Sequence, residues 1–459
     1  MAEFWDIIGG AIIGFSNWIW GMPLFLLLIG GGLYFMIYSG FVPLRYYKRA
    51  LSSLNAKDSS APGQISSFEA LMSAIASTTG MGSIAGVAVA LTMGGPGAIF
   101  WMWVSAIVGM ATKFFEGTLT IMYRGKDTVG EAQGGTMYMI TEGLGKKWKP
   151  AAIFFSIFGL IGTLCLMQAN QLTEAFTTVI TTPAGIENTI LLRSIVGVVL
   201  CIIVSIVVLG GIKRISKVSA KVVPIMVALY FLLVAYIIVT NLSAVPDVFA
   251  SIFNGAFKID AGAGGLAGSA IVIGARRAAF VNEAGIGTAS MMHGASKNKE
   301  PVREGLVAMI GPSIDSGLIC TLTALAVLIG GGAYNNVENI KGIEIVLGAF
   351  ENSMPGVGQY LLLVAVLIFA FTTMFSYSYY GVKCTNFLFG AKYAHYYNYF
   401  FLIMLITGAV ISLESVVGII DSAFALMAIP TMITMLILSP KAKREMKRYF
   451  AKQKESTPQ

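Results

Sequence analysis

Long runs of apolar residues separated by short polar stretches extend along the chain and predict eleven membrane-spanning helices. Each run has about the 20 residues that a helix needs to cross the hydrocarbon core of a bilayer. The runs are continuous rather than alternating, so they are not typical of a transmembrane β-barrel. The predicted spans are residues 18–42, 66–97, 98–122, 150–180, 190–209, 218–240, 264–294, 306–329, 359–381, 396–411 and 416–438.

The second of these runs is interrupted at its middle by polar and flexible residues. Its segment Ser77–Ser83 reads STTGMGS, and each glycine lowers helix stability by about 1 kcal/mol relative to alanine. Within a bilayer, open backbone is tolerated only where protein or a polar cavity covers it. A span broken near its midpoint predicts a transporter binding site, whereas the spacing of Gly82 and Gly86 alternatively indicates close helix packing.

Composition and charge agree with a helical membrane protein and predict its orientation. Hydrophobic residues make up 56% of the chain and charged residues 12%, about half the charged fraction of an average soluble domain. The lysines and arginines that give the net charge of +8 gather in short loops and in the C-terminal tail. Because such loops stay in the cytoplasm, we expect a multi-pass plasma-membrane protein with its N-terminus outside and its C-terminus inside.

Several function classes find no support in the sequence. The basic residues follow the topology rather than a nucleic-acid-binding pattern, and no nucleotide-binding P-loop is present. The chain has no HExxH or Gly-x-Ser-x-Gly motif of an enzyme and no TVGYG-like filter of a channel. The four cysteines lack paired spacing, so neither a disulfide framework nor a bound metal cofactor is expected.

The number of spans predicts an internal repeat. Without the first span ten remain, and two sets of five would have opposite orientations, which is an inverted repeat. The first member of each set, residues 66–97 and 264–294, is then expected to be a broken helix. The predicted parts are an extra N-terminal helix with a linker (1–64), a first repeat with an external segment (65–262), a second repeat (263–438) and a basic cytoplasmic tail (439–459).

Two alignments of the repeats place the second interruption differently. Matching residues 73–75 with 269–271, both SAI, places it near residues 273–275. Matching residues 80–83 with 285–288 places it lower in the membrane. Half a bilayer needs about 10 helical residues, and counting from Gly264 favours the first alignment.

Three sequence runs resemble the signature of the alanine/glycine:cation symporters. They are GGPGAIFWMWV at 94–104, NEAGIG at 282–287 followed by GPSID at 311–315, and QAN at 168–170. The resemblance extends over most of the chain and implies a LeuT-like fold with one extra N-terminal helix. It also implies sodium-coupled uptake of alanine or glycine. Proton-coupled transport of other small neutral amino acids is the alternative, and an ion channel is a less favoured one.

We expect the substrate to bind at the two interruptions. A substrate carboxylate suits the free amides at the start of a half-helix, and freed carbonyls suit its ammonium group. Gln168 or Asn170 would reach the site from the fourth span, or would form only a hydrogen bond between helices. The predicted substrate-binding residues are Thr78, Thr79, Gly80, Met81, Gly82, Gln168, Asn170, Ile273, Gly274 and Phe280.

The resemblance further implies a sodium site between the first and eighth core helices. Sodium prefers hard oxygen ligands, and residues at i, i+3 and i+4 share one helix face, a spacing that Phe369, Thr372 and Thr373 have. Alternatively, each threonine hydroxyl bonds only to the carbonyl four residues before it. The predicted sodium ligands are Ala76, Thr79, Phe369, Thr372 and Thr373.

Charged residues inside spans are costly and therefore indicate function or pairing. The residues predicted to act in coupling or gating are Asp315, Glu283, Arg276 and Arg277. Asp315 would couple the ion or hold a second cation, or else it would pair with one of the arginines. Glu283 would pair with an arginine in a cytoplasmic gate. Lys113 and Glu116, three residues apart, predict a structural ion pair.

Overall fold

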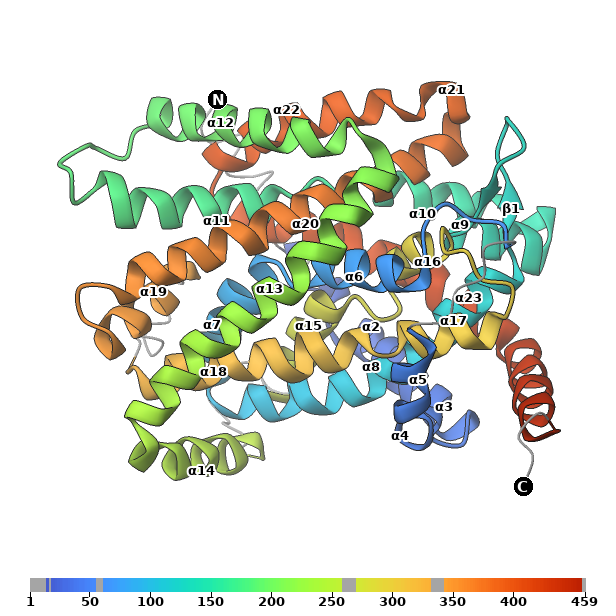
Figure 1. Cartoon of the computed structure of the whole chain (residues 1–459), viewed down its shortest axis with the longest axis horizontal. Coiled ribbons are helices and arrows are strands. Elements are labelled where there is room, and N and C mark those ends of the chain that lie inside the picture. Colours follow the sequence, from blue (N-terminus) through green and yellow to red (C-terminus); the bar gives the residue numbers. More distant parts are fainter. Residues whose placement is uncertain (1–13, 16–17, 55–60, 258–269, 332–341, 456–459) are drawn as a thin grey trace.

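The computed structural model describes residues 14–15, 18–54, 61–257, 270–331 and 342–455. Its long helices lie roughly along one direction, with the short helices α14 and α19 at one end and the hairpin strand β1 at the other (Figure 1). We name the end with β1 the inner end, because the charge pattern predicts that it faces the cytoplasm. The elements before the first broken helix are α2 (Met22–Phe25), η1 (Leu26–Gly30), α3 (Gly31–Tyr38), α4 (Val42–Arg45) and α5 (Tyr47–Ser53).

The middle of the chain is helical apart from one small hairpin, in which β1 and β2 pair antiparallel. Its elements are α6 (Ser67–Thr78), α7 (Met81–Gly94), α8 (Gly97–Met122), β1 (Gly125–Lys126), β2 (Ala132–Gln133), α9 (Thr136–Tyr138), η2 (Met139–Leu144), η3 (Lys146–Trp148), α10 (Lys149–Gly162), α11 (Leu166–Phe176), η4 (Thr177–Thr181), α12 (Ile190–Val208), α13 (Gly211–Thr240), η5 (Leu242–Ala244) and α14 (Val245–Ala256).

The C-terminal part begins with a second broken helix and ends in a long one. Its elements are α15 (Ala270–Asn282), α16 (Thr288–His293), α17 (Pro301–Ala308), η7 (Ser313–Ile319), α18 (Cys320–Ile329), α19 (Ile343–Ser353), α20 (Gly358–Phe389), α21 (Ala391–Ala394), α22 (Tyr396–Val410) and α23 (Leu413–Glu455). The last helix continues without interruption from the predicted eleventh span into the basic tail.

Eight helical segments of the described chain are long and apolar enough to cross a membrane. They are Ser67–Gly94, Gly97–Met122, Lys146–Thr181, Ile190–Val208, Gly211–Thr240, Pro301–Ile329, Gly358–Phe389 and Leu413–Gln453. The other three predicted spans correspond to shorter helices, namely Met22–Tyr38, α15 with α16, and α22. Membrane-spanning helices are therefore confirmed, while the count of eleven and the orientation stay predictions.

The first interruption lies where the sequence predicts it. α6 begins with a capping box, in which the Ser66 hydroxyl accepts from the Glu69 amide and the Glu69 carboxylate accepts from the Ser66 amide. The helix ends at Thr78, and α7 starts at Met81 after Gly80. In the most apolar 18-residue stretch of this broken helix 100% of the residues are buried, whereas in that of α12 only 17% are. The break therefore lies at the centre of the bundle and α12 lies at its periphery.

The second interruption contradicts the favoured alignment. α15 is helical from Ala270 to Asn282, so a break near residues 273–275 is wrong. The chain instead leaves the helix at Glu283, whose φ is 51°, and Gly285 and Gly287 have φ of 85° and 104°. Glycine adopts this left-handed backbone readily. The less favoured alignment, which pairs 80–83 with 285–288, is therefore the one that fits.

A further interruption lies in the fourth predicted span. α10 ends at Gly162 and α11 begins at Leu166, and Cys165 between them has a left-handed φ of 54°. The apolar run of residues 150–180 instead predicts one continuous helix. Thr163 occupies the gap, where its hydroxyl donates to the Gly159 carbonyl at 2.7 Å and lies 3.2 Å from the Tyr397 hydroxyl.

Candidate functional site

The start of α7 offers free backbone donors at the first interruption. Gly80 occupies the N-cap position and has no side chain that could accept a hydrogen bond from the first turn. The first amides of a helix lack partners within the helix and carry a partial positive charge. Met81 and Gly82 are therefore placed to receive an anionic group, and both residues are buried.

Two aromatic rings limit the space beside this turn. A Cβ atom on Gly82 would lie 3.1 Å from Cε1 of Phe280 on α15. The Phe280 ring in turn lies 5.5 Å from that of Phe424 on α23, measured between centroids. Phe280 therefore contacts the α7 turn from the opposite broken helix.

A hydroxyl of α20 reaches the last turn of α6 just before the interruption. Thr373 Oγ1 donates to the Ala76 carbonyl at 2.8 Å and to the Phe369 carbonyl at 3.0 Å. Three oxygen atoms of the predicted sodium site thus converge from two helices. This cluster is buried, since Thr373, Ala76 and Phe369 are all 0% exposed.

The other two predicted sodium ligands are oriented differently. The Thr372 hydroxyl donates within α20, to the carbonyls of Ile368 at 2.8 Å and Phe369 at 3.0 Å, and lies 3.6 Å from Met226 Sδ on α13. Thr79 Oγ1 donates to the Ile75 carbonyl at 2.5 Å. Both hydroxyls follow the local pattern of threonines in membrane helices, so Thr79 would contribute through its carbonyl.

Asp315 is a buried carboxylate beside the last turn of α6. It lies in η7 beside the Thr78 hydroxyl and is 1% exposed. Its Oδ1 accepts from the Ser316 amide at 2.7 Å, whereas its Oδ2 is buried and has no hydrogen-bond partner in the described chain. A buried carboxylate oxygen without a donor is a candidate ligand for a cation or a proton.

The buried arginines pair with Asp421, which is outside the set of residues predicted to act in coupling or gating. Arg276 lies 2.7 Å from Asp421 of α23, and Arg277 lies 4.0 Å from the same carboxylate. The guanidinium group of Arg276 also lies 5.7 Å from the ring centroid of Trp20. The alternative of a salt bridge to Asp315 is therefore wrong, and this cluster ties α15 to α23 and to the N-terminal helix.

Glu283 has hydroxyl partners rather than the expected arginine. Its carboxylate accepts hydrogen bonds from the Tyr377 hydroxyl of α20 and from the Thr288 hydroxyl at the start of α16. It therefore bridges the second broken helix to the helix that carries Thr373. Nothing in the sequence indicates that Tyr377 is a partner of Glu283, because the two residues lie 94 positions apart.

Three predicted substrate residues make structural contacts, and a fourth, Gln168, is buried on the same helix as one of them. The Asn170 amide donates to the Ile411 carbonyl at 2.6 Å, and α11, which also carries the buried Gln168, packs mainly against α22. Gly274 lies against Ala98 and Trp101 of α8, and Ile273 lies against Gly94 at the far end of α7. Ile273 and Gly274 were predicted to bind substrate because the second break was expected beside them, and α15 is helical at both residues.

Lys113 and Glu116 do not form the expected ion pair within 4.0 Å among the described residues. Glu116 instead accepts from the Ser290 amide of α16 at 2.8 Å and from the Gly285 amide at 3.5 Å. Both side chains are buried, with Lys113 3% and Glu116 0% exposed. Glu116 therefore joins α8 to the second interruption.

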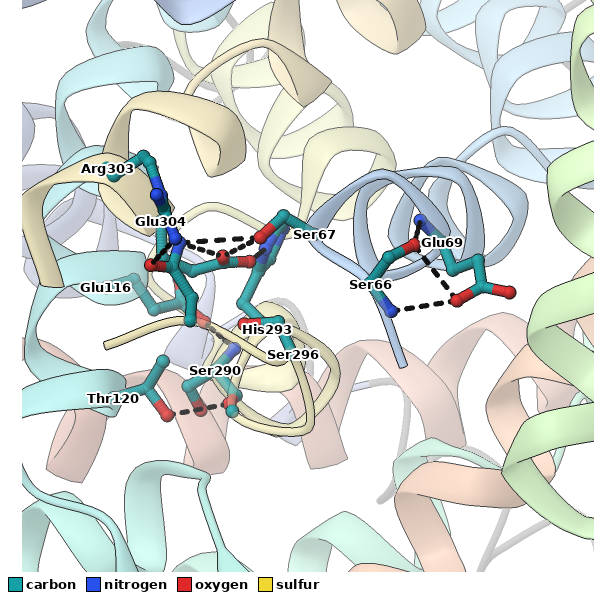
Figure 2. Close-up of polar contacts among 12 residues, drawn as sticks. Ser66, Ser67, Glu69, Glu116, Thr120, Ser290, His293, Ser296, Arg303 and Glu304 are labelled. Atoms are coloured by element: carbon teal, nitrogen blue, oxygen red, sulfur yellow. Dashed lines mark hydrogen bonds and ion pairs between the residues drawn. The ribbon is translucent and has the colours of Figure 1, made fainter. Parts of the chain in front are cut away.

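A buried polar cluster, here named the inner latch, joins the inner ends of the two broken helices. It consists of Ser67, His293, Asn298 and Glu304, and Figure 2 shows Glu304 between His293 and Ser67. The Glu304 carboxylate lies 2.7 Å from His293 Nδ1 and accepts from the Ser67 hydroxyl at 2.6 Å and from the Asn298 amide at 2.9 Å. The carboxylate is thus fully satisfied by hydrogen bonds despite its burial.

Backbone contacts and one arginine reinforce the inner latch. The amide of Gln64 donates to the Ala295 carbonyl at 2.8 Å, and that of Lys297 donates to the Ile65 carbonyl at 2.6 Å. Arg124 donates to the carbonyls of Gly294 at 2.9 Å and Pro62 at 3.0 Å. These contacts hold the inner ends of α6 and α16 together.

A hollow of about 310 Å³ lies beside the inner latch. Its lining includes Gln64, Gln133, Tyr379, Lys383 and Asn386. Nearby, burial alone would raise the pKa of the loop residue Asp127, but its hydrogen bonds, led by that from Asn386, lower it. Asp127 therefore stays ionised at neutral pH and holds the inner end of α20 next to this hollow.

Replacing Glu304 with Gln is expected to open the inner end of the protein. Hydrogen bonds to a buried charged group contribute about 1.5–3 kcal/mol, so their loss should raise the open population at least about tenfold. A cysteine at Ala70 of α6, in a background with the native cysteines replaced, should then react faster with a thiol reagent applied from the inner side. Glu300→Gln, at the half-buried partner of Arg448, is the matched control, and equal labelling in both variants would rule out the latch.

Residues 6–459 match the model of the sodium:alanine symporter family. The chain belongs to this family. It is therefore a multi-pass membrane transporter of amino acids with cations rather than an enzyme.

Several relatives in the family are similar over nearly their whole length. The chain is 38% identical to the sodium/alanine symporter AgcS of Methanococcus maripaludis, covering 92% of this chain and 93% of that protein. It is 34% identical to the amino-acid carrier protein AlsT of Bacillus subtilis, covering 96% and 92%. It is also 32% identical to the probable sodium/glutamine symporter GlnT of the same organism, covering 96% and 91%.

A solved structure confirms the fold. The crystal structure of MhsT in complex with L-phenylalanine matches with a TM-score of 0.58 at 15% identity, covering 83% of this chain and 98% of that one. MhsT has a LeuT-like fold, so the fold that the sequence resemblance implied is confirmed at the level of architecture. At this identity the likeness shows the fold alone.

Proposed function

We propose that the protein imports small neutral amino acids, alanine and glycine, together with sodium by alternating access. The observation that carries the proposal is the first interruption, where uncapped amides of α7 follow within a few residues the α6 carbonyl that Thr373 contacts. One break then serves a carboxylate on one side and a cation on the other. The relative named as a sodium/alanine symporter supports this substrate class.

The expected site uses the two ends of the broken helix for opposite charges. The substrate carboxylate would accept from the Met81 and Gly82 amides. Sodium would take the carbonyls of Ala76, Thr79 and Phe369 and the hydroxyl of Thr373, with Thr372 on the same helix. Phe280, in contact with Gly82, would leave room for a methyl group and exclude longer side chains.

A second candidate is coupling to protons, for which two buried carboxylates provide a place. Asp315 Oδ2 has no donor in the described chain, and Glu283 bridges α16 and α20. In a sodium symporter Asp315 would instead hold a second cation or set the charge near the first break. The same carboxylates therefore serve either mechanism, and the driving ion distinguishes them.

Binding of radiolabelled alanine to the purified protein tests the substrate and the cation together. We expect binding in sodium but not in potassium or choline, and displacement by glycine at concentrations within about tenfold of those of alanine. Leucine and glutamine should compete poorly because of Phe280. Strong displacement by glutamine would overturn the size limit, and alanine binding that ignores sodium would overturn the cation site.

A further inference from the structure

The hollow of about 310 Å³ at the inner end reaches the periphery of the bundle. One part of its lining is the turn between α12 and α13, and another is α21 with the start of α22. The helices α12 and α22 pack side by side at one edge of the bundle (Figure 1). Ligand pockets measure about 300–1,000 Å³, so this hollow has room for one small group.

The lining of the hollow has an apolar part and a polar part. The apolar part belongs to the α12–α13 turn and includes Leu209, Ile212 and Ile215. The polar part belongs mainly to the inner hairpin and to α20 and includes Gln133, Lys383 and Asn386. Leu209 is 54% exposed, so the apolar part continues onto the surface that faces lipid. A ligand that matches both parts is amphipathic.

Lys383 contributes a buried positive charge to this lining. Its side chain is 4% exposed, its Nζ donates to Gln133 Oε1, and Nζ lies 5.0 Å from the ring centroid of Tyr379. No carboxylate of the described chain lies within 4.0 Å of it. An ammonium group carries three donors, and a buried charge is stable where it is paired. Lys383 can therefore accommodate a further, negatively charged acceptor.

The nearby carboxylate of Asp127 is directed at two amides instead. It accepts from Gln133 Nε2 at 2.7 Å and from Asn386 Nδ2 at 3.2 Å. The Gln133 side chain thus lies between this carboxylate and the Lys383 ammonium. Asp127 therefore orients the amides of the lining rather than pairing directly with the lysine.

Two further polar atoms of lining residues have no hydrogen-bond partner in the described part of the chain. They are the Tyr379 hydroxyl and Asn386 Oδ1, and both residues belong to the lining. Buried polar atoms without a partner are costly and point to a missing ligand or water. One of these atoms can donate and the other can only accept, so a ligand that offsets both has an acceptor and a donor.

The residues around the hollow are those of a membrane interface. Lys213 and Arg214 are exposed in the first turn of α13, directly after the lining residue Ile212. Tyr393 and Tyr396 are 49% and 57% exposed on α21 and α22. Exposed tyrosines gather at the level of the lipid headgroups, and basic pockets between helices on the cytoplasmic side suit anionic headgroups.

We propose that the hollow binds the phosphate group of an anionic phospholipid from the inner leaflet, with a headgroup that carries hydroxyls. The Lys383 ammonium and the Tyr379 hydroxyl donate to the phosphate, and Asn386 Oδ1 accepts from a headgroup hydroxyl. The apolar α12–α13 turn contacts the adjoining carbon atoms of the lipid. The bound lipid joins this turn to the inner end of α20. No residue of the first interruption belongs to the lining, so the site is separate from that for the transported amino acid.

Binding of phosphatidylglycerol to the delipidated full-length protein in a neutral detergent tests the proposal, with native mass spectrometry as the readout. The wild type should bind it at least about tenfold more tightly than phosphatidylcholine, whose headgroup carries a positive charge and no hydroxyl. Equal affinities for the two lipids would overturn the proposal. Inorganic phosphate in about hundredfold excess should not displace the lipid, and displacement would assign the hollow to free phosphate instead.

Lys383→Met should weaken phosphatidylglycerol binding at least about tenfold, because it removes the charge that receives the phosphate. Lys392→Met is the matched control, since it removes the same charge from an exposed position on α21. It should leave the affinity unchanged. Equal losses in both variants would show only a general attraction of the basic surface and would overturn the site.

Tyr379→Phe separates ligand binding from stability. It removes a hydroxyl that has no partner in the described chain, so the melting temperature without lipid should stay the same. The affinity for phosphatidylglycerol should still fall about threefold or more. An unchanged affinity in this variant would contradict the assigned contact to the phosphate.

Two further comparisons keep the test decisive. If Lys383→Met does not fold, Ile212→Trp fills the hollow from its apolar part and should abolish lipid binding, whereas Ile206→Trp, at a position of α12 that is 57% exposed, should not. Equal lipid binding in these two variants would overturn the site. Alanine with sodium should leave the bound lipid in place, and displacement by alanine would assign the hollow to the transported substrate instead.

Discussion

Gly80→Val is expected to abolish sodium-dependent alanine transport. A Cβ atom at this position would lie 2.5 Å from Thr373 Oγ1, closer than real Cβ atoms approach, and 3.1 Å from its Cγ2, which is a tight contact. Valine would therefore push α20 away from the interruption and disturb the free amides and the sodium ligands together. Because misplacement by about 1 Å costs on the order of a hundredfold in a preorganised site, alanine uptake should fall by at least that factor.

Gly348→Val is the matched control for this substitution. Gly348 lies on the exposed face of α19, where a Cβ atom would meet nothing within 4 Å. Uptake by this variant should equal that of the wild type at the same protein level. Alanine binding of normal affinity in Gly80→Val would contradict the assignment of the first interruption as the site.

Thr373→Ala is expected to raise the sodium concentration that half-saturates transport by at least about tenfold, because it removes an oxygen ligand and the contact that holds α20 against α6. Thr373 is the residue whose hydroxyl contacts both helices, through the Ala76 and Phe369 carbonyls. Thr373→Ser keeps the hydroxyl and should stay within about threefold of the wild type. The measurement is alanine uptake as a function of sodium concentration at fixed ionic strength.

Thr385→Ala provides the control on the same helix. The Thr385 hydroxyl donates to the Gly381 carbonyl of its own helix at 2.9 Å and reaches no other helix in the described chain. Its removal should leave the sodium dependence unchanged. An unchanged sodium dependence in Thr373→Ala would remove that residue from the cation site.

The features predicted correctly from the sequence have local signals. Serine, threonine and glycine within an apolar run indicate a break at residues 77–83, and helix formation on both sides follows from the apolar residues. The spacing of Phe369, Thr372 and Thr373 is likewise local, although which hydroxyl reaches α6 depends on how α20 is rotated. The family that the sequence resemblance indicates is confirmed, because the matching run at residues 94–104 is long.

The features missed depend on distant contacts or on backbone conformation. Counting about 10 helical residues from Gly264, which lies outside the described residues, predicts the second break too early in the chain. The actual break begins at Glu283, whose left-handed backbone has no signal in the sequence. The partner of Arg276, Asp421, lies 145 residues away. Glu304 and His293 lie outside the spans' central regions, so nothing in the pattern indicated that they join both broken helices.

The most direct test of the account is alanine uptake by the purified protein in liposomes, with an inward sodium gradient compared with an inward proton gradient. The account predicts that alanine accumulates with the sodium gradient and does not accumulate with the proton gradient alone. Accumulation driven by protons alone would contradict the sodium site at Thr373 and transfer the coupling role to Asp315 or Glu283. No alanine movement under either gradient would contradict the proposed substrate.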